Sequence, residues 1–145
     1  MKLYIKSFSE LTNEELYGIY YIRTAVFVVE QNCPYQEVDE NDRIAWHLWL
    51  EENSEILAYC RVYPKGDIWR IGRVLSARRR QGLGSQILKE AISFIRSHTA
   101  AKAIELDAQS YAIEFYEKQG FKKITEEFME DGIPHITMRL EIENE

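Results

Sequence analysis

The chain has 145 residues, a length typical of one domain, and we expect a single domain over residues 1–145. It carries 24 acidic and 18 basic side chains, for a net charge of −6. This charge argues against binding to nucleic acid or to an anionic membrane, because both depend on a basic field. No apolar run approaches the roughly 20 residues of a membrane helix, and the N-terminal stretch lacks a signal-peptide core, so we expect a cytoplasmic protein.

Residues 3–8 alternate between apolar and polar side chains, which predicts a first strand. Thr12 and Glu15 have the spacing of a capping box, so we expect a helix from about Asn13 to about Val29.

The next stretch, residues 30–43, is polar and contains one proline, which predicts a loop or a short helix. Three strand patterns separated by turn residues follow it. They cover residues 45–52, 56–64 and 68–76.

The second half of the chain begins with apolar residues at helical spacing, which predict an amphipathic helix over about 83–97. A short apolar strand over 103–108 follows, and then a helix over 111–121. Gly120 should close that helix, with Phe121 packed back against it. Two strand-like pieces flank an Asp131-Gly132 turn near the C-terminus.

The resulting order is β-α-(α)-β-β-β-α-β-α-β-β. It predicts an α/β fold of the mixed α+β kind, because a three-strand meander precedes a strand-helix-strand unit. We expect a central, mostly antiparallel, twisted sheet of about six to seven strands with helices on both faces.

The segment RRRQGLG lies between a predicted strand and a predicted helix, which is a typical layout for binding a phosphate. Gly82 and Gly84 would let the backbone turn closely and direct free N–H groups, with the helix dipole, at one point. A Walker loop would need Lys and then Ser or Thr after Gly84, but Ser85 follows. A dinucleotide fingerprint would need glycine where Ile87 stands.

Residues 79–84 instead match a third pattern: Arg or Gln, two residues of any kind, Gly, one residue, then Gly or Ala. This resembles the pyrophosphate loop of the GCN5-related N-acetyltransferases (GNAT). A second signature of that superfamily, Ala-x-x-Phe-Tyr-x-x-x-Gly-Phe, occupies residues 112–121. The chain further resembles the ElaA family over roughly residues 20–139, in five segments: RTAVFVVEQNCPY, the D-x-x-D of Asp39 and Asp42, AYCRV, IGRV and EDGIPHITM.

The resemblance implies the GNAT fold and an enzyme that transfers acetyl from acetyl-CoA directly to a primary amine. It implies that the strand before the loop splays from its neighbour, and that main-chain groups of Val74 and Ser76 bind the pantetheine arm. A backbone N–H near Val74 would stabilise the developing oxyanion. The resemblance assigns the pyrophosphate to Arg79, Arg80, Gln81, Gly82, Leu83, Gly84 and Ser85.

Two further positions, those of Arg78 and Gln109, have a cofactor-side role by resemblance. Arg78 or Arg80 reaches the 3′-phosphate or faces water. Gln109 stands where many members carry asparagine, and its amide is available to pantetheine or to a water.

Tyr116 matches the superfamily's general acid, which protonates the departing CoA thiolate. A phenol with a pKa near 10 is protonated at neutral pH and can donate at short range. A core tyrosine on an amphipathic helix is the alternative. Tyr111 is a weaker substitute, because it lies outside the tyrosine position of the motif.

The acceptor amine must lose a proton, and the candidate bases or acceptor-binding groups are Glu30, His47 and His135. His47 lies among strand aromatics, so a structural imidazole is an equal alternative. The acidic segment over 37–42 is either a solvated surface or an acceptor-binding group, through Glu37, Asp39 and Asp42. The wider acid-rich segment over 30–42 favours a cationic acceptor.

Competing functions remain open at this point. A non-catalytic CoA-binding or regulatory module would keep the phosphate loop and use Tyr116 as a structural residue. An RNA-binding arginine patch is disfavoured by the acidic total. We expect no metal, because Arg43 stands where an EF-hand needs a ligand. We expect a small-molecule or peptide amine as partner, and the resemblance allows a homodimer paired through edge strands.

Overall fold

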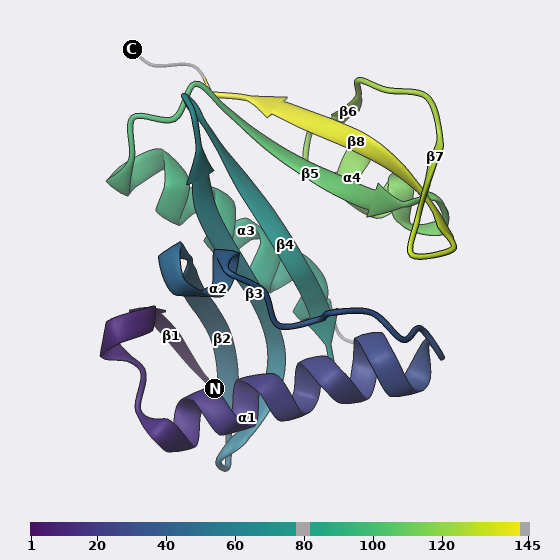
Figure 1. Cartoon of the computed structure of the whole chain (residues 1–145). Helices are drawn as coiled ribbons and strands as arrows, with labels where there is room; N and C mark the ends of the chain where they lie inside the picture. The colour runs from purple at the N-terminus through teal and green to yellow at the C-terminus, as the bar shows by residue number, and fades with distance from the viewer. Residues whose placement is uncertain (78–81, 143–145) are drawn as a thin grey trace.

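The computed structural model describes residues 1–77 and 82–142, which form one mixed sheet with helices on both faces (Figure 1). The eight strands seen in these residues run in the order β1-β2-β3-β4-β5-β8-β6, with β7 also pairing with β8. They are β1 Lys2–Ser7, β2 Trp46–Glu52, β3 Glu55–Lys65, β4 Ile68–Ser76, β5 Ala103–Gln109, β6 Lys122–Lys123, β7 Phe128–Glu130 and β8 Ile133–Glu141. The mixed, mostly antiparallel sheet is confirmed. It has one strand more than the upper expected number, because two short strands precede β8.

Helices cover about the stretches that the sequence predicts. They are α1 Asn13–Arg23, α2 Asn41–Ile44, α3 Leu83–His98 and α4 Ile113–Glu117, with a π-helical segment η2 over Thr24–Glu30. The predicted capping box is present, since Glu15 N–H donates to Thr12 Oγ1 at 3.1 Å and Thr12 N–H donates back to Glu15 Oε1 at 2.9 Å. The expected helix over 13–29 is therefore helical throughout, but its last two turns widen into η2.

The helix expected over 111–121 is shorter in the structure. It begins with a 3-10 turn, η3 Ser110–Ala112, and α4 ends at Glu117. Gly120 has φ +99°, and Phe121 is buried and donates its N–H to Tyr116 O at 3.3 Å. The predicted glycine closure, with Phe121 packed back, is confirmed.

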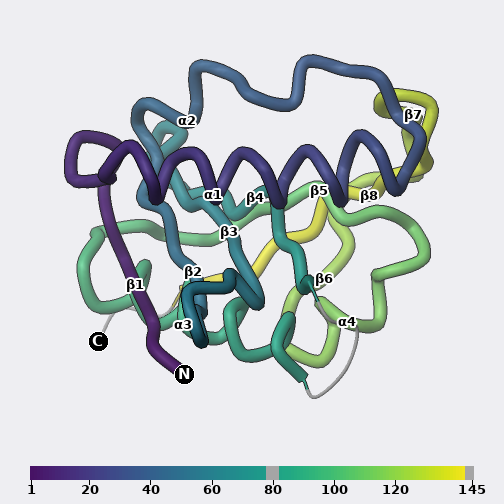
Figure 2. The backbone as a smooth tube through the Cα atoms, turned by 90° about the horizontal axis from the view of Figure 1, so that it is seen from below, coloured from purple at the N-terminus to yellow at the C-terminus, as the bar shows by residue number. Residues whose placement is uncertain are grey.

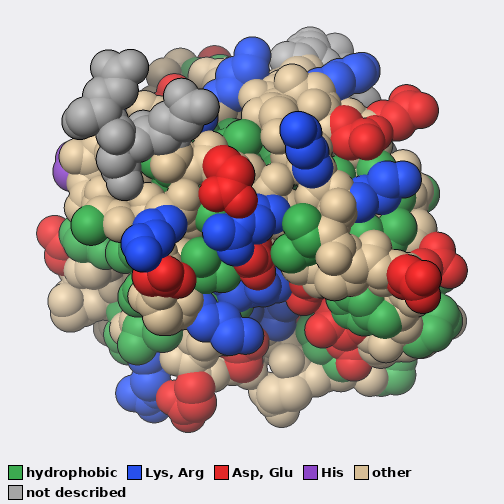
Figure 3. All heavy atoms as spheres, turned by 90° about the horizontal axis from the view of Figure 1, so that it is seen from above, with side chains coloured by type: hydrophobic (Ala, Val, Ile, Leu, Met, Phe, Trp, Pro, Cys, Tyr) green, Lys and Arg blue, Asp and Glu red, His purple; other side chains and the backbone are tan. Residues whose placement is uncertain are grey.

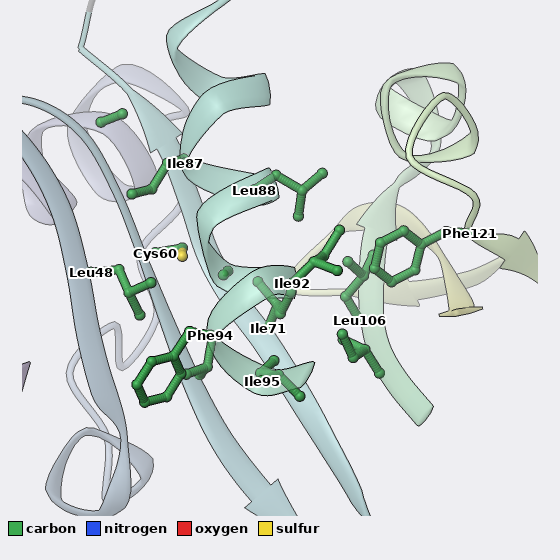
Figure 4. Packing of buried hydrophobic residues seen from close by; sticks show 14 of the residues in the cluster. Leu48, Cys60, Ile71, Ile87, Leu88, Ile92, Phe94, Ile95, Leu106 and Phe121 are labelled. Carbon is green, nitrogen blue, oxygen red and sulfur yellow. The ribbon is translucent and has the colours of Figure 1, made fainter. Parts of the chain in front are cut away.

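Two apolar cores lie on opposite faces of the sheet. Helix α3 covers one face (Figure 4), where its apolar side chains meet alternate residues of β2 to β5. That core includes Leu48, Cys60, Ile71, Ile87, Leu88, Ile92, Phe94, Ile95, Leu106 and Phe121. Helix α1 covers the other face through a smaller cluster, built on Ile19, Trp49, Tyr59 and Leu75.

Strands β4 and β5 form a parallel pair that opens toward their C-terminal ends (Figure 1). Only two pairs of residues are in register, Trp69 with Ile104 and Arg70 with Glu105. Beyond them, residues 71–76 of β4 and 106–109 of β5 are not paired with each other. The sheet therefore opens between β4 and β5, as the resemblance implies.

A bulge shapes the β4 side of this opening. Leu75 pairs with Tyr59 and Gly72 with Arg61, so two β4 residues, Arg73 and Val74, lie opposite one β3 residue. Arg73 has φ +53°, which a non-glycine residue adopts only when its surroundings hold it there. A bulge redirects the strand that carries it and increases its twist.

Candidate active site

The N-terminus of α3 presents free amide groups beside the opening. Gly82 is the N-cap, with φ +68°, and Gln86 N–H donates to Gly82 O at 2.9 Å. Because that is the first hydrogen bond of an α-helix, the amides of residues 83–85 have no acceptor within the helix. Together with the helix dipole they form a site for an anion. The predicted contacts of Arg78, Arg79, Arg80 and Gln81 lie outside the described residues.

Gly84 and Ser85 fix this helix end to its neighbours. A Cβ built on Gly84 would lie 3.5 Å from the Phe115 ring of α4 and 3.9 Å from Cβ of Ser76 on β4. Ser85 Oγ accepts a hydrogen bond from Gln119 Nε2 at 3.1 Å. The anion site is therefore held next to the C-terminal end of β4, together with the end of α4.

Val74 and Ser76 direct their main-chain groups into the opening. Ala77 N–H donates to Leu57 O on β3 at 2.9 Å. Main-chain groups of successive strand residues point to opposite edges, so those of Ser76 and Val74 face away from β3. An extended ligand lying between β4 and β5 can bond this edge as a further strand would.

Tyr116 lies on the α3 side of the opening. Its ring contacts Phe115 and Phe121 edge-on, with centroid distances of 5.0 and 6.1 Å. Burial raises the pKa of the Tyr116 phenol, and the proximity of Cys60 and Tyr111 acts in the same direction. Tyr116 therefore keeps its proton at neutral pH. Tyr111, the weaker substitute, is 82% exposed.

His47 is completely buried on the α1 side, and both of its ring nitrogens have partners within the protein. Nε2 lies 3.0 Å from Asp42 O, which only accepts, so Nε2 carries the proton. Nδ1 then accepts from the Tyr59 hydroxyl at 2.6 Å. Burial lowers the pKa of His47 and favours the neutral ring. Both ring nitrogens of His47 are thus occupied within the protein, which favours the structural alternative.

The acidic segment over 37–42 is largely enclosed. Glu37 and Asp42 are 5% and 1% exposed, and both accept hydrogen bonds from the fully buried Arg23, at 2.6 Å in each case. Asp39 pairs with Arg61 at 2.6 Å. The expectation of a solvated acidic surface is wrong, because arginines distant in sequence fold over these carboxylates and occupy their oxygens. Within the acid-rich segment over 30–42, the carboxylates of Glu37, Asp39 and Asp42 are thus already paired with arginines.

Arg73 joins this network from the bulge. Its Nη2 donates to Glu37 O at 2.8 Å, and its guanidinium lies 5.5 Å from the Tyr35 ring centroid. The network therefore combines three guanidiniums, those of Arg23, Arg61 and Arg73, with three carboxylates. It connects α1, β3 and the β4 bulge to the loop between η2 and α2.

The C-terminal end of β5 meets the end of η2 on the α1 side. Gln109 Nε2 donates to Gln31 Oε1 at 3.3 Å, and Cys33 Sγ lies 3.3 Å from Asp131 O. Figure 2 shows the same approach, with the end of the long N-terminal helix beside β7. Glu30 ends η2 and is exposed. Gln31 follows Glu30 directly and is the C-cap residue of η2.

His135 lies directly beside Gln109 in the sheet, as its register partner on β8. Its Nδ1 is 2.7 Å from Ile133 O, and its Nε2 is 3.8 Å from Glu130 Oε2. The structure thus brings Gln109 and His135 together at one edge of the opening, and it separates both from His47. Glu130 was not selected from the sequence, because an acidic residue in a hairpin is common.

The surface near β5 and β8 has mixed charge. Arg139 pairs with Glu105 at 2.7 Å and with Glu141 at 2.6 Å, and Arg70 pairs with Asp107 at 2.9 Å. The face drawn in Figure 3 likewise shows acidic and basic side chains intermixed. Such a mixture differs from the continuous basic patch of a nucleic-acid surface.

Over 1–77 and 82–142, no cluster of three or more His, Cys, Asp or Glu side chains has the arrangement of a metal site. In the same part of the chain, no helix has both the length and the apolar character needed to cross a membrane.

This mixed sheet with helices on both faces matches the fold of a solved acyl-CoA N-acyltransferase. A family model for the acetyltransferase (GNAT) domain matches residues 9–142. The chain therefore belongs to the GNAT family, and its relatives place it in the ElaA-like group. GNAT proteins are N-acyltransferases that use acyl-CoA.

The relatives match over nearly their whole length. Protein ElaA of Escherichia coli is 39% identical over 92% of this chain and 92% of its own. Its crystal structure superposes with a TM-score of 0.92 over 97% of this chain and 100% of that one, at 36% identity. The UPF0039 protein C11D3.02c of Schizosaccharomyces pombe is 42% identical over 94% of this chain and 95% of its own. An acyl-CoA N-acyltransferase from Pseudomonas aeruginosa superposes with a TM-score of 0.88 at 38% identity, covering 96% and 99% of the chains.

Proposed function

We propose that the protein transfers the acetyl group of acetyl-CoA to a primary amine by direct attack, without an acyl-enzyme. The observation that carries this proposal is the position of the α3 N-terminus beside the free edge of β4. A diphosphate can bind the N-terminus of α3 while a pantetheine arm lies along the edge of β4. Residues 71–76 of β4 and 106–109 of β5 are not paired with each other, so the two strands do not close the sheet at this point.

The residues of this region fit acetyl-CoA. The amides of residues 83–85 bind the diphosphate, because Gly82 and Gly84 present no side chain in the way. Val74 and Ser76 bond the pantetheine arm through their main chains. A main-chain N–H at Val74, beside the bulge, is suited to receive the negative charge that develops on the thioester oxygen.

Tyr116 supplies the proton that the departing thiolate needs. Burial keeps the phenol protonated at neutral pH, so its hydroxyl can donate to the sulfur as negative charge develops there and the C–S bond breaks. Such proton transfer contributes roughly 10²- to 10⁴-fold to rate.

A screen with thiol detection tests the proposal. The full chain is incubated with acetyl-CoA and a panel of small primary amines, amino sugars and peptide amines, and release of free CoA is followed. We expect thiol release that depends on one class of amine. If CoA binds but none of these acceptors releases thiol, the protein is the non-catalytic CoA-binding module instead.

A further inference from the structure

His135 is held rigidly at the start of β8. It pairs in register with Gln109 on β5 and with Phe128 on β7, and it is 8% exposed. Its ring stacks on Phe128, with 6.1 Å between centroids and 23° between planes. A side chain fixed on both sides in this way can serve as a precisely oriented group.

The hydrogen bond to Ile133 determines which nitrogen of His135 is basic. Ile133 O can only accept, so the proton of the neutral ring lies on Nδ1, at 2.7 Å from that oxygen. Nε2 therefore carries the lone pair. Its neighbour Glu130 Oε2, at 3.8 Å, is beyond hydrogen-bond distance. In the Nδ1–H form of His135, Nε2 can only accept a hydrogen bond, and so can an ionised Glu130 carboxylate. A donor group placed between these two atoms would therefore bond both.

The face on which His135 lies is opposite to that of Tyr116. Met138 and Ile136 of β8 contribute to the core under α3, and Tyr116 packs against that same core. Side chains alternate along a strand, so His135, like its partner Gln109, points to the α1 side. An acid and a base on opposite faces of the opening suit a reaction in which the nucleophile enters from one side and the thiolate is protonated from the other.

We infer that His135 Nε2 and the Glu130 carboxylate together form the acceptor site, and that the acceptor is a primary ammonium. Glu130 attracts and orients the cation, and His135 removes its proton. This inference rests on the proposed function and identifies the residues that bind and deprotonate the amine at that same site.

The protons of the step balance. The ammonium gives one proton to His135 Nε2, and the freed lone pair forms the C–N bond as the C–S bond breaks. The thiolate takes the proton of Tyr116. The second proton lost by the nitrogen restores Tyr116 through solvent, and His135 releases its proton to solvent. The net products are an amide, a free thiol and one proton.

The first test observes His135 directly, without turnover. In the ¹⁵N-labelled chain saturated with CoA, long-range ¹H–¹⁵N spectra should show the Nδ1–H form of His135. Added n-butylammonium should shift the Nε2 resonance of His135. 1-Butanol, which has the same chain without the charge, and tetramethylammonium, which has the charge without N–H, should not shift it. An Nε2–H tautomer, or equal responses to all three probes, would overturn the inference.

The second test uses variants and the acceptor found by the thiol screen. His135→Gln should lower kcat/KM for the amine by about 10²-fold near neutral pH, and activity should recover as alkaline pH deprotonates the amine in solution. Glu130→Gln should raise KM for the amine more than it lowers kcat. Glu126→Gln is the matched control, because it removes the same charge from the loop before β7. A His135 defect that is equal at every pH would indicate a structural role and contradict the inference.

Failure of the inference can be separated from failure of the proposed function. Calorimetry with CoA reports the cofactor side alone, and His135→Gln and Glu130→Gln should leave that affinity unchanged. If wild type releases thiol while Glu30→Gln, rather than His135→Gln, gives the pH-dependent loss, the acetyltransferase stands and the base is Glu30. If wild type neither binds CoA nor releases thiol, the proposed function itself is wrong.

Discussion

Arg23 of α1 and Asp42 of α2 face each other through two hydrogen bonds, of 2.6 Å from Nη1 to Oδ1 and 3.1 Å from Nη2 to Oδ2. Neither side chain is more than 1% exposed. Asp42 Oδ1 also accepts from Arg61 Nη1 at 2.9 Å. These residues, with Arg73, lie in the segments by which the chain resembles the ElaA family. Those segments therefore encode a buried ion-pair network on the α1 side of the sheet. This is the side to which Gln109 and His135 also point.

Removing one arginine from this network should strongly lower the free energy of unfolding. Arg23→Met leaves two buried carboxylates, Glu37 and Asp42, without their main partner, and we expect the free energy of unfolding to fall by about 3–5 kcal/mol. Urea denaturation measures this change. Arg43→Met is the control, because Arg43 is exposed and pairs only with exposed Glu40, so we expect a change below about 0.5 kcal/mol. Similar values for both variants would contradict a stabilising network.

Stability should fall at mildly acidic pH because of His47. Burial lowers its pKa in the folded state, whereas an unfolded chain has a histidine pKa of about 6.5. Below about pH 6.5 the unfolded state therefore binds a proton that the native state does not, and unfolding becomes easier by up to about 1.4 kcal/mol per pH unit. Urea midpoints between about pH 7.5 and 5 should show this slope. His47→Gln should reduce it, and an unchanged slope in that variant would contradict the role of His47.

A second loss of stability should appear at lower pH. Burial alone would raise the pKa of Asp42, but hydrogen bonds and charge from Arg23 outweigh it and lower the pKa. The native carboxylate therefore contributes stability above the unfolded pKa of about 3.9, and this contribution is lost as pH falls below that value. Acid unfolding followed by circular dichroism should show the loss, and Asp42→Asn should show a shallower dependence together with lower stability at neutral pH.

The hydroxyl of Tyr116 can be tested by itself. Tyr116→Phe keeps the ring contacts with Phe115 and Phe121, so folding and CoA affinity should be unchanged. We expect kcat to fall by about 10²-fold or more, since the thiolate would leave unprotonated. Initial rates of thiol release at saturating acetyl-CoA measure the effect. Tyr111→Phe, which alters an exposed phenol, should behave as wild type; unchanged turnover in Tyr116→Phe would remove its acid role.

The two glycines at the start of α3 should respond differently to alanine. Gly82 has φ +68°, and a Cβ there would meet nothing within 4 Å, so the cost of Gly82→Ala is purely conformational, about 1–2 kcal/mol. If the helix start relaxes to avoid that strain, CoA affinity should weaken by about tenfold. In Gly84→Ala the new Cβ makes ordinary contact with Phe115 at 3.5 Å, and we expect a stability change within about 0.5 kcal/mol. Urea denaturation measures the change in stability of both variants, and calorimetry measures the change in CoA affinity of Gly82→Ala.

Local patterns in the sequence predict most of the fold. The Thr12–Glu15 box, the alternation in the strands and the Gly120 closure are each determined by residues close in sequence, so the elements are recoverable. The π-helical η2 is not, because its apolar spacing does not distinguish it from an α-helix. The bulge at Arg73 is a property of strand register, for which the pattern of β4 alone gives no signal.

The site is predictable only where a motif spans it. Gly82, Gly84 and Tyr116 follow from two short patterns, whereas the environment of the acidic residues depends on arginines 14 to 36 residues away. Such pairing is tertiary, and so a solvated loop was the natural expectation for Glu37 and Asp42. Glu130 became a candidate only through its distance to His135.

The central claim is that the α3 amides and the β4 edge hold acetyl-CoA together, and calorimetry that compares acetyl-CoA with S-acetylpantetheine tests it most directly. Both ligands carry the thioester and the arm, but only acetyl-CoA carries the diphosphate. We expect acetyl-CoA to bind one molecule per chain and S-acetylpantetheine to bind at least about tenfold more weakly. Equal affinities, or no heat of binding with acetyl-CoA, would contradict the account.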